Sequence, residues 1–128
     1  MLRWELISLD VERDGGPTAC SCHKATLHVD SGDLYVLGRY VEPERRGSLD
    51  VLSGGGTNTT GLPCPFYKFS TRNGQWTRLS SDVRAEGGPA CIYDHQMVID
   101  EVEDVIWVFG GRTLGLGNSG KNMGEGED

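Results

Sequence analysis

The chain has 128 residues, which is enough for one small domain. Its hydrophobic fraction of 37% is too high for a fully disordered chain, and its 19 glycines are too many for a helical one. The net charge of −7 argues against nucleic acid as a partner, because phosphate binding needs clustered Lys and Arg. The one basic cluster, Arg45-Arg46, follows Glu42 and Glu44 and is neutralised locally.

No apolar run approaches the ~20 residues that a membrane-spanning helix needs. Arg3, Glu5 and Asp10 interrupt any apolar region near the first residue, so we expect no signal peptide and no membrane. The cysteines are then expected as reduced thiols in a cytoplasmic protein; they are Cys20, Cys22, Cys64 and Cys91.

Strands and turns alternate along the chain. Runs rich in β-branched and aromatic residues predict strands at residues 24–29, 33–37, 66–69, 75–79, 96–99 and 105–109. Short polar segments, including Asn73-Gly74, predict hairpin turns at residues 30–33, 71–74 and 101–104. No stretch shows sustained helical periodicity, so the sequence predicts an all-β fold of antiparallel hairpins.

A repeat with a fixed offset of 72 residues organises these elements. The matching pairs are Trp4 and Trp76, Asp10 and Asp82, Gly15-Gly16-Pro17 and Gly87-Gly88-Pro89, His23 and His95, and Gly38 and Gly110. Each unit reads as strand, turn, strand ending in glycine, loop, strand, turn and strand with Trp. Four antiparallel strands per repeat make one blade of a β-propeller.

Paired glycines after the second strand, then an aromatic residue and a Trp in the fourth strand, resemble the kelch repeat. The residues at structural kelch positions are Trp4, His23, Gly38, Phe69, Trp76, His95, Gly110 and Gly111. Phe69 stands where the family usually has Tyr. In the first unit the doublet reads Gly38-Arg39, and the offset exceeds the ~50 residues usual for kelch by a long loop at 40–65.

Several phrases are similar to the muskelin family of kelch-repeat proteins: Cys22-His23-Lys24, Asp94-His95-Gln96-Met97, and residues 35–40, 66–69, 82–89 and 109–112. The resemblance covers roughly residues 3–113. It implies a non-catalytic protein–protein interaction scaffold without cofactors, cytoplasmic and also nuclear, associated with the CTLH-type E3 ubiquitin ligase. The discoidin-like domain and the LisH and CTLH motifs of the family are not in this sequence.

The repeat divides the chain into four parts. Residues 1–22 are expected to hold the last strand of a preceding blade and a connecting loop, 23–80 one complete repeat, and 81–113 the first half of the next. Residues 114–128 form a low-complexity tail expected to be disordered. A closed propeller needs about four to eight blades, so we expect a partial propeller, a fragment that needs further blades for a stable fold.

Residues that could carry chemistry also have structural interpretations. His23 and His95 could be ligands or bases, but a repeated position favours a structural role, such as a hydrogen bond between the first strand and a loop. Cys20, Cys22 and His23 supply at most three metal ligands without a second pair, so no metal is expected. Residues 54–56 are three glycines without the Lys-Ser/Thr of a phosphate loop.

Trp107 lies in the middle of the predicted strand at 105–109. This strand has apolar residues on both faces, which suits a blade packed between two neighbouring blades. Arg39 and Arg112 follow the strand-two glycines and are expected either to pair with a carboxylate or to contact a partner from the propeller rim.

Two other classes remain open. An extracellular attractin-type kelch domain would have oxidised cysteines and a glycan on Asn58. A kelch-propeller enzyme, such as a copper oxidase or a cyclase, needs ligands that converge on one pore mouth. Two partial blades do not supply such a set, so we expect no catalytic residue.

Overall fold

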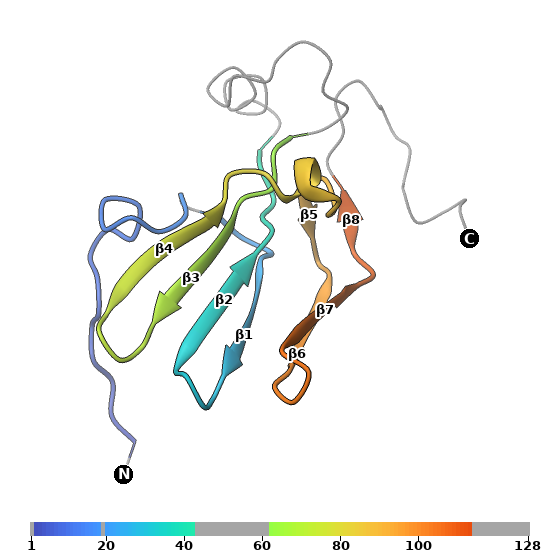
Figure 1. The fold of residues 1–128 in the computed structure, drawn as a ribbon. Coiled ribbons are helices and arrows are strands. Elements are labelled where there is room, and N and C mark those ends of the chain that lie inside the picture. Colours follow the sequence, from blue (N-terminus) through green and yellow to red (C-terminus); the bar gives the residue numbers. More distant parts are fainter. Residues whose placement is uncertain (1, 19, 43–61, 114–128) are drawn as a thin grey trace.

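The computed structural model describes residues 2–18, 20–42 and 62–113 (Figure 1). In these residues the protein is all-β, with antiparallel sheets and one 3-10 helix of four residues. The all-β prediction is therefore confirmed. Within the described residues, no helix is long and apolar enough to cross a membrane.

Two predicted features fall outside the described residues. One is most of the loop at 40–65, including the glycines at 54–56 and the sequon at Asn58. The other is the tail at 114–128.

The predicted complete repeat forms a four-stranded antiparallel sheet in the order β1-β2-β3-β4 (Figure 1). Its strands are β1 (Lys24–His28), β2 (Asp33–Leu37), β3 (Phe66–Ser70) and β4 (Gln75–Ser80). Each begins and ends within one residue of its predicted bounds, because strand-forming side chains are bounded by clear turn signals. Neighbouring strands in the chain are neighbours in the sheet, and the register shifts once, between Phe66 and Tyr67.

Two turns of this sheet are tied to each other. Gly32 (φ 79°) and Gly74 (φ 72°) adopt left-handed conformations that favour glycine. The backbone N–H and the hydroxyl of Thr71 both donate to the carbonyl of Gly32, at 2.9 and 2.7 Å. The Arg72 guanidinium donates to the carbonyl of Asp30 at 2.6 Å. These bonds join the β1–β2 turn to the β3–β4 turn.

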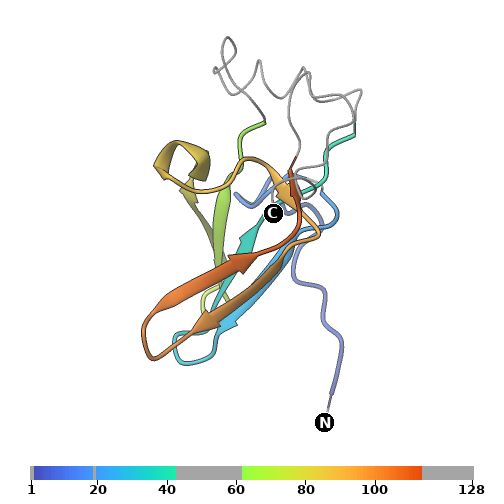
Figure 2. The same ribbon diagram turned by 90° about the vertical axis from the view of Figure 1, so that its right-hand side faces the viewer.

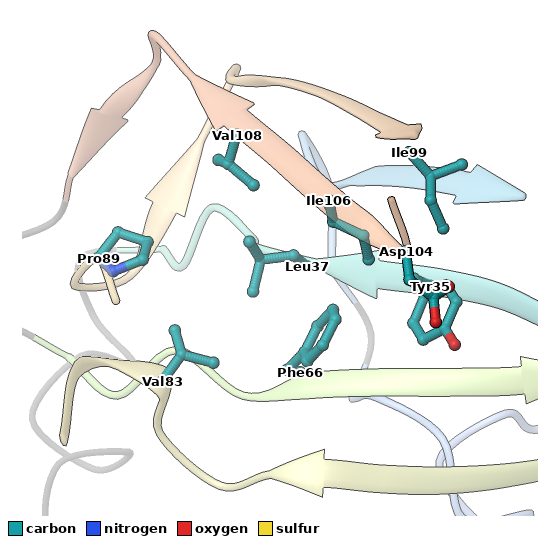
Figure 3. A pocket seen from close by; sticks show the side chains of 9 residues that line it. All are labelled: Tyr35, Leu37, Phe66, Val83, Pro89, Ile99, Asp104, Ile106 and Val108. Carbon is teal, nitrogen blue, oxygen red and sulfur yellow. The ribbon is translucent and has the colours of Figure 1, made fainter. Parts of the chain in front are cut away.

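The predicted third hairpin is formed by β6 (Gln96–Asp100) and β7 (Val105–Phe109). Figure 2 shows this hairpin in front of β1 and β2, so the strands form two layers. Side chains of β7 alternate between half-buried and exposed, as a strand packed on one face requires. Ile106 and Val108 point toward the four-stranded sheet (Figure 3). Trp107 lies between them in the strand, so it belongs to the opposite face, and it is 59% exposed.

Glu101, in the turn of the β6–β7 hairpin, is hydrogen-bonded to the β1–β2 turn. Its carboxylate accepts hydrogen bonds from the backbone N–H groups of Val29 (2.9 Å) and Asp30 (3.3 Å). It also lies 3.8 Å from the Nδ1 atom of His28. The hydrogen bond from Val29 is the main reason that the pKa of Glu101 lies below its usual value.

The core lies between the two layers and at one end of the sheet. One cluster consists of Leu37, Cys64 and Ile92, with Phe66, Val83, Met97 and Val108 packed against it. A second consists of Val41, Leu62 and Cys91, with Tyr40 and Tyr93 packed against it. The first cluster contains residues of both sequence units, so apolar contact holds the β6–β7 hairpin against the four-stranded sheet.

Three short elements at this end were not predicted. They are η1 (Val83–Glu86), β5 (Ile92–Tyr93) and β8 (Arg112–Thr113), and β5 pairs with β8. A two-residue strand or a single 3-10 turn carries no measurable periodicity, so the sequence gives no signal for them.

The predicted strand around Trp4 is wrong. Residues 2–8 form no strand, and Trp4 is fully exposed instead of packed in a blade. A strand depends on hydrogen bonds to a neighbouring strand, and none of the strand pairs among the described residues includes this segment. Trp76, at the same repeat position, does lie in a strand because β3 pairs with it.

The repeat also extends into a turn that occurs twice. The N–H of Gly16 donates to the carbonyl of Val11 at 2.9 Å, and the N–H of Gly88 donates to the carbonyl of Val83 at 2.7 Å. In both copies an Asp side chain caps the turn, Asp10 accepting from the N–H of Arg13 and Asp82 from that of Arg84. The two Gly-Gly-Pro motifs therefore end the same local structure.

Candidate functional site

An apolar groove lies between the four-stranded sheet and the β6–β7 hairpin (Figure 3). Its volume is about 400 Å³. The first unit contributes Tyr35, Leu37 and Phe66, and the second contributes Val83, Pro89, Ile99, Asp104, Ile106 and Val108. Most of these side chains are apolar, which is typical of a site that binds by burial of hydrophobic surface.

The floor of the groove is formed by β2 and β3. Leu37 and Phe66 are opposite each other in the β2–β3 register. The rings of Tyr35 and Phe66 stack with centroids 5.9 Å apart and an interplanar angle of 22°. These contacts form the floor of the groove.

One wall of the groove is fixed by the cap of η1. Asp82 accepts hydrogen bonds from the N–H groups of Arg84 (3.1 Å) and Cys64 (3.0 Å). Its second carboxylate oxygen pairs with the Arg84 guanidinium at 2.8 Å. Val83 follows this cap directly, so its side chain is held against the groove (Figure 3).

The polar groups of the groove are at the Asp104 end. Burial raises the pKa of Tyr35, and the carboxylates of Asp33 and Asp104 raise it further. The Tyr35 hydroxyl therefore remains protonated at neutral pH and can donate a hydrogen bond. Asp104 is largely exposed and adds a negative charge at this end. The two groups favour a ligand with a hydrogen-bond acceptor or a cation here.

His95 lies behind the groove as a packing element. It is fully buried, and a Cβ atom at Gly38 would lie 2.5 Å from its Cε1 atom. At Gly111 a Cβ atom would lie 2.8 Å from the Cβ of His95. A Cβ atom at residue 38 would clash with the His95 ring and one at residue 111 with the Cα and Cβ atoms of His95, so the predicted positions Gly38, His95 and Gly111 come together in one contact.

The hydrogen bond suggested for His95 stays a prediction. Neither ring nitrogen has a partner at hydrogen-bond distance and angle among the described residues. Burial lowers the pKa of His95, and a weaker hydrogen-bonding effect of the Leu37 backbone opposes part of that lowering. The ring is therefore neutral at neutral pH, and it packs against the glycines at 38 and 111.

The other predicted structural positions differ in how closely they are packed. Trp76 packs on Phe69, its partner across the β3–β4 pair, with ring centroids 4.9 Å apart. His23 is exposed, and its Nδ1 atom lies 3.6 Å from the Cys20 sulfur. A Cβ atom at Gly110 would meet nothing within 4 Å.

The predicted rim contact at Arg39 is wrong, because this side chain is buried. Its guanidinium donates to the carbonyl of Pro63 at 3.3 Å, and its backbone N–H donates to the carbonyl of Ile92 at 2.9 Å. The chain after β2 turns inward to meet β5, which the sequence pattern does not reveal. Arg112 is exposed in β8, and its role as a partner contact stays a prediction.

The cysteines form no disulfide, and all of them lie in the described part of the chain. Burial raises the pKa of the Cys64 thiol to about 11, which keeps it protonated and unreactive at neutral pH. Among residues 2–18, 20–42 and 62–113, no group of three or more His, Cys, Asp or Glu side chains could hold a metal ion.

Sequence reasoning missed the groove, although one signal pointed to it. Val83 and Pro89 line it, and the same offset of 72 residues connects them to Val11 and Pro17 in the segment 1–22. Val11 and Pro17 line a second hollow of about 400 Å³ beside the N-terminal turn. Each copy of the repeated turn thus places a Val and a Pro at the edge of a hollow.

No family model matches this sequence. The chain is similar to "Mei4-dependent protein 6" of Schizosaccharomyces pombe (strain 972 / ATCC 24843), with 33% identity over 97 residues. The match covers 76% of this chain and 13% of that protein, so the chain spans only a small part of its relative's length.

Proposed function

We propose that this chain is part of a kelch-type β-propeller and serves as a non-catalytic scaffold for protein–protein interaction. The observation that carries the proposal is the stacking of two sequence-equivalent units. The β6–β7 hairpin packs Ile106 and Val108 on the four-stranded sheet and leaves Trp107 and Phe109 exposed on its other face. A unit that packs by one face and presents an apolar second face fits a series of stacked blades.

The muskelin-like phrases support a more specific role. A relative of that family would act in the cytoplasm and the nucleus, and it would contribute to a CTLH-type E3 ubiquitin ligase. The apolar groove and the exposed aromatic face supply binding surfaces, as a scaffold requires. The remaining blades would then come from sequence or partners beyond these residues.

The test is recovery of the ligase subunits with the tagged 128-residue chain from a cytoplasmic extract. We expect these subunits to be recovered, and we expect Trp107→Asp to lower the recovery at least about tenfold, as for an aromatic interface residue. Val102→Asp is the matched control, because Val102 is exposed in the β6–β7 turn and away from the strand face.

Two results would contradict the proposal. One is recovery of the chain without any subunit of such a ligase. The other is a secreted chain with a glycan on Asn58 and oxidised cysteines, which would indicate the attractin-type alternative.

A further inference from the structure

The β3–β4 turn contains Asn73-Gly74, a dipeptide that suits the turn and is also chemically labile. Asn73 is the only asparagine of this sequence that is followed by glycine. Gly74 supplies a positive φ of 72°, and the side-chain oxygen of Asn73 accepts a hydrogen bond from the N–H of Gln75 at 3.0 Å. The side-chain amide of an asparagine before glycine is also attacked readily by the next backbone nitrogen, because glycine has no side chain in the way.

The dipeptide is open to water. Residues 71–75 are all exposed. A Cβ atom built at Gly74 would meet nothing within 4 Å, so the space beside this residue is empty among the described residues. Nothing in the described structure therefore shields the two reacting groups from solvent.

Hydrogen bonds of the turn oppose the reaction in the folded protein. The N–H of Gly74, whose nitrogen must attack, donates to the carbonyl of Ser70 at 2.8 Å. The N–H of Asn73 donates to the Ser70 hydroxyl at 3.3 Å, and the bond from Gln75 holds the Asn73 side chain. The reaction therefore requires the turn to open, and its rate is the rate in a free peptide multiplied by the fraction of time that the turn is open.

We propose that Asn73 is a site of spontaneous deamidation, that the hydrogen bonds of the β3–β4 turn slow this reaction, and that the isoaspartate formed loosens the contact between this turn and the β1–β2 turn. The modification needs no enzyme and no reagent except water. It is a slow, irreversible change of the four-stranded sheet.

The reaction has two steps. In the first, the backbone nitrogen of Gly74 forms a bond to the Cγ atom of Asn73, the bond from Cγ to the side-chain nitrogen breaks, and ammonia leaves with the proton of the Gly74 amide. In the second, water adds to one of the two carbonyl carbons of the resulting succinimide ring and opens it. The product is aspartate or isoaspartate, each with a new carboxylate that releases its proton to solvent at neutral pH.

Isoaspartate changes the backbone as well as the charge. The main chain then passes through the Cβ atom of residue 73, which adds one atom to the turn. The two neighbouring residues, Thr71 and Arg72, make the contacts with the β1–β2 turn, to the carbonyls of Gly32 and Asp30. A longer main chain at residue 73 moves these donors away from their acceptors, whereas ordinary aspartate leaves the main chain unchanged.

The first experiment compares the 128-residue chain with a synthetic peptide of residues 69–78 at mildly alkaline pH. Deamidation is followed as a mass gain of about 1 Da. Peptide mapping separates residue 73 from Asp14-Gly15, which forms the same kind of ring. We expect both to deamidate at Asn73, and the peptide to react at least about tenfold faster than the folded chain.

Two variants test whether the contact between the turns controls the rate. Thr71→Val removes the hydroxyl that donates to Gly32 and should speed deamidation about two- to tenfold. Thr77→Val is the matched control, because Thr77 is exposed in β4 away from the turn, and it should leave the rate unchanged. If Thr71→Val fails to fold, the comparison of peptide and unaltered chain still tests the slowing.

The second experiment measures amide hydrogen exchange in the purified isoaspartate product. We expect exchange at the Thr71 amide, which donates to Gly32, to be at least about tenfold faster than in the unmodified chain. Asn73→Asp carries the same new charge on an ordinary main chain, and its Thr71 amide should exchange at the unmodified rate.

Three outcomes would overturn the inference. The first is equal rates of deamidation in the peptide and the folded chain. The second is a folded chain with no product at residue 73 after about a hundred half-lives of the peptide. The third is an isoaspartate product whose Thr71 amide is as protected as in the unmodified chain.

Discussion

The β1–β2 and β6–β7 hairpins come from equivalent stretches of the sequence but have different surroundings. Leu37 at the end of β2 is 5% exposed, whereas Phe109, its equivalent at the end of β7, is 58% exposed. β2 has a strand on each side and a hairpin over one face, whereas β7 pairs only with β6 among the described residues. The comparison teaches that the repeat encodes strands and turns, and that burial depends on which neighbour is present.

The largest expected difference between the two units is at their equivalent glycines. Both have positive φ, 91° at Gly38 and 76° at Gly110, so an Ala costs about 1–2 kcal/mol at either position. At Gly38 the new Cβ would also lie 2.4 Å from the carbonyl oxygen of Ile92. We expect Gly38→Ala to lower the free energy of unfolding by a further 1–3 kcal/mol or so, measured by urea denaturation. Equal losses at the two positions would show that the hairpin does not pack as described.

The two equivalent tryptophans give the next largest effect. Trp76 contacts the rings of Phe69 and Tyr67, with centroids 4.9 and 6.2 Å away, and Trp4 is fully exposed. We expect Trp76→Ala to destabilise the protein by about 2 kcal/mol, less than for a fully buried Trp. For Trp4→Ala we expect a free energy of unfolding within about 0.5 kcal/mol of the wild-type value. Thermal denaturation of both variants measures the difference. A large loss at Trp4 would mean that the N-terminal segment packs on the sheet.

The two equivalent histidines differ in burial, because His95 is fully buried and His23 is exposed. Burial holds the pKa of His95 below the ordinary value of about 6.5, so the unfolded chain binds more protons than the folded one in the window just below that value. Stability contributed by neutral His95 is therefore lost as the pH falls through this window. We expect His95→Met to reduce the slope of stability against pH between 7 and 5, measured by urea denaturation at each pH. An identical slope in the variant and the wild type would contradict the burial of His95.

The smallest expected effect is at Glu101, which joins the two hairpin turns. Its pKa is lowered, so the contribution of its charge is present above the unfolded value of about 4.3 and is lost as the pH falls through the folded value. We expect Glu101→Gln to speed hydrogen exchange at the amides of Val29 and Asp30 at neutral pH, and much less under acidic conditions. Glu103→Gln, in the same turn, is the control and should change neither amide.

Much of the local structure could be predicted from the sequence. The bounds of β2 and β7 were predicted to the residue, because strand-forming side chains lie between segments that turn. The glycines at 38 and 111 were identified as structural positions, but the reason for them was not. Only the structure shows that both glycines make room for His95, because that contact joins residues far apart in the chain.

The sequence by itself determined the strands, the turns and the equivalence of the two units, since these depend on local periodicity and on residues such as Gly and Asn in turns. The tertiary structure decided that Arg39 is buried, that Trp4 is exposed, and that a groove opens beside β7. The physical reason is that burial and strand pairing are properties of neighbours. A repeated motif has the same local preferences in both copies, but it is buried only where another strand or sheet lies against it.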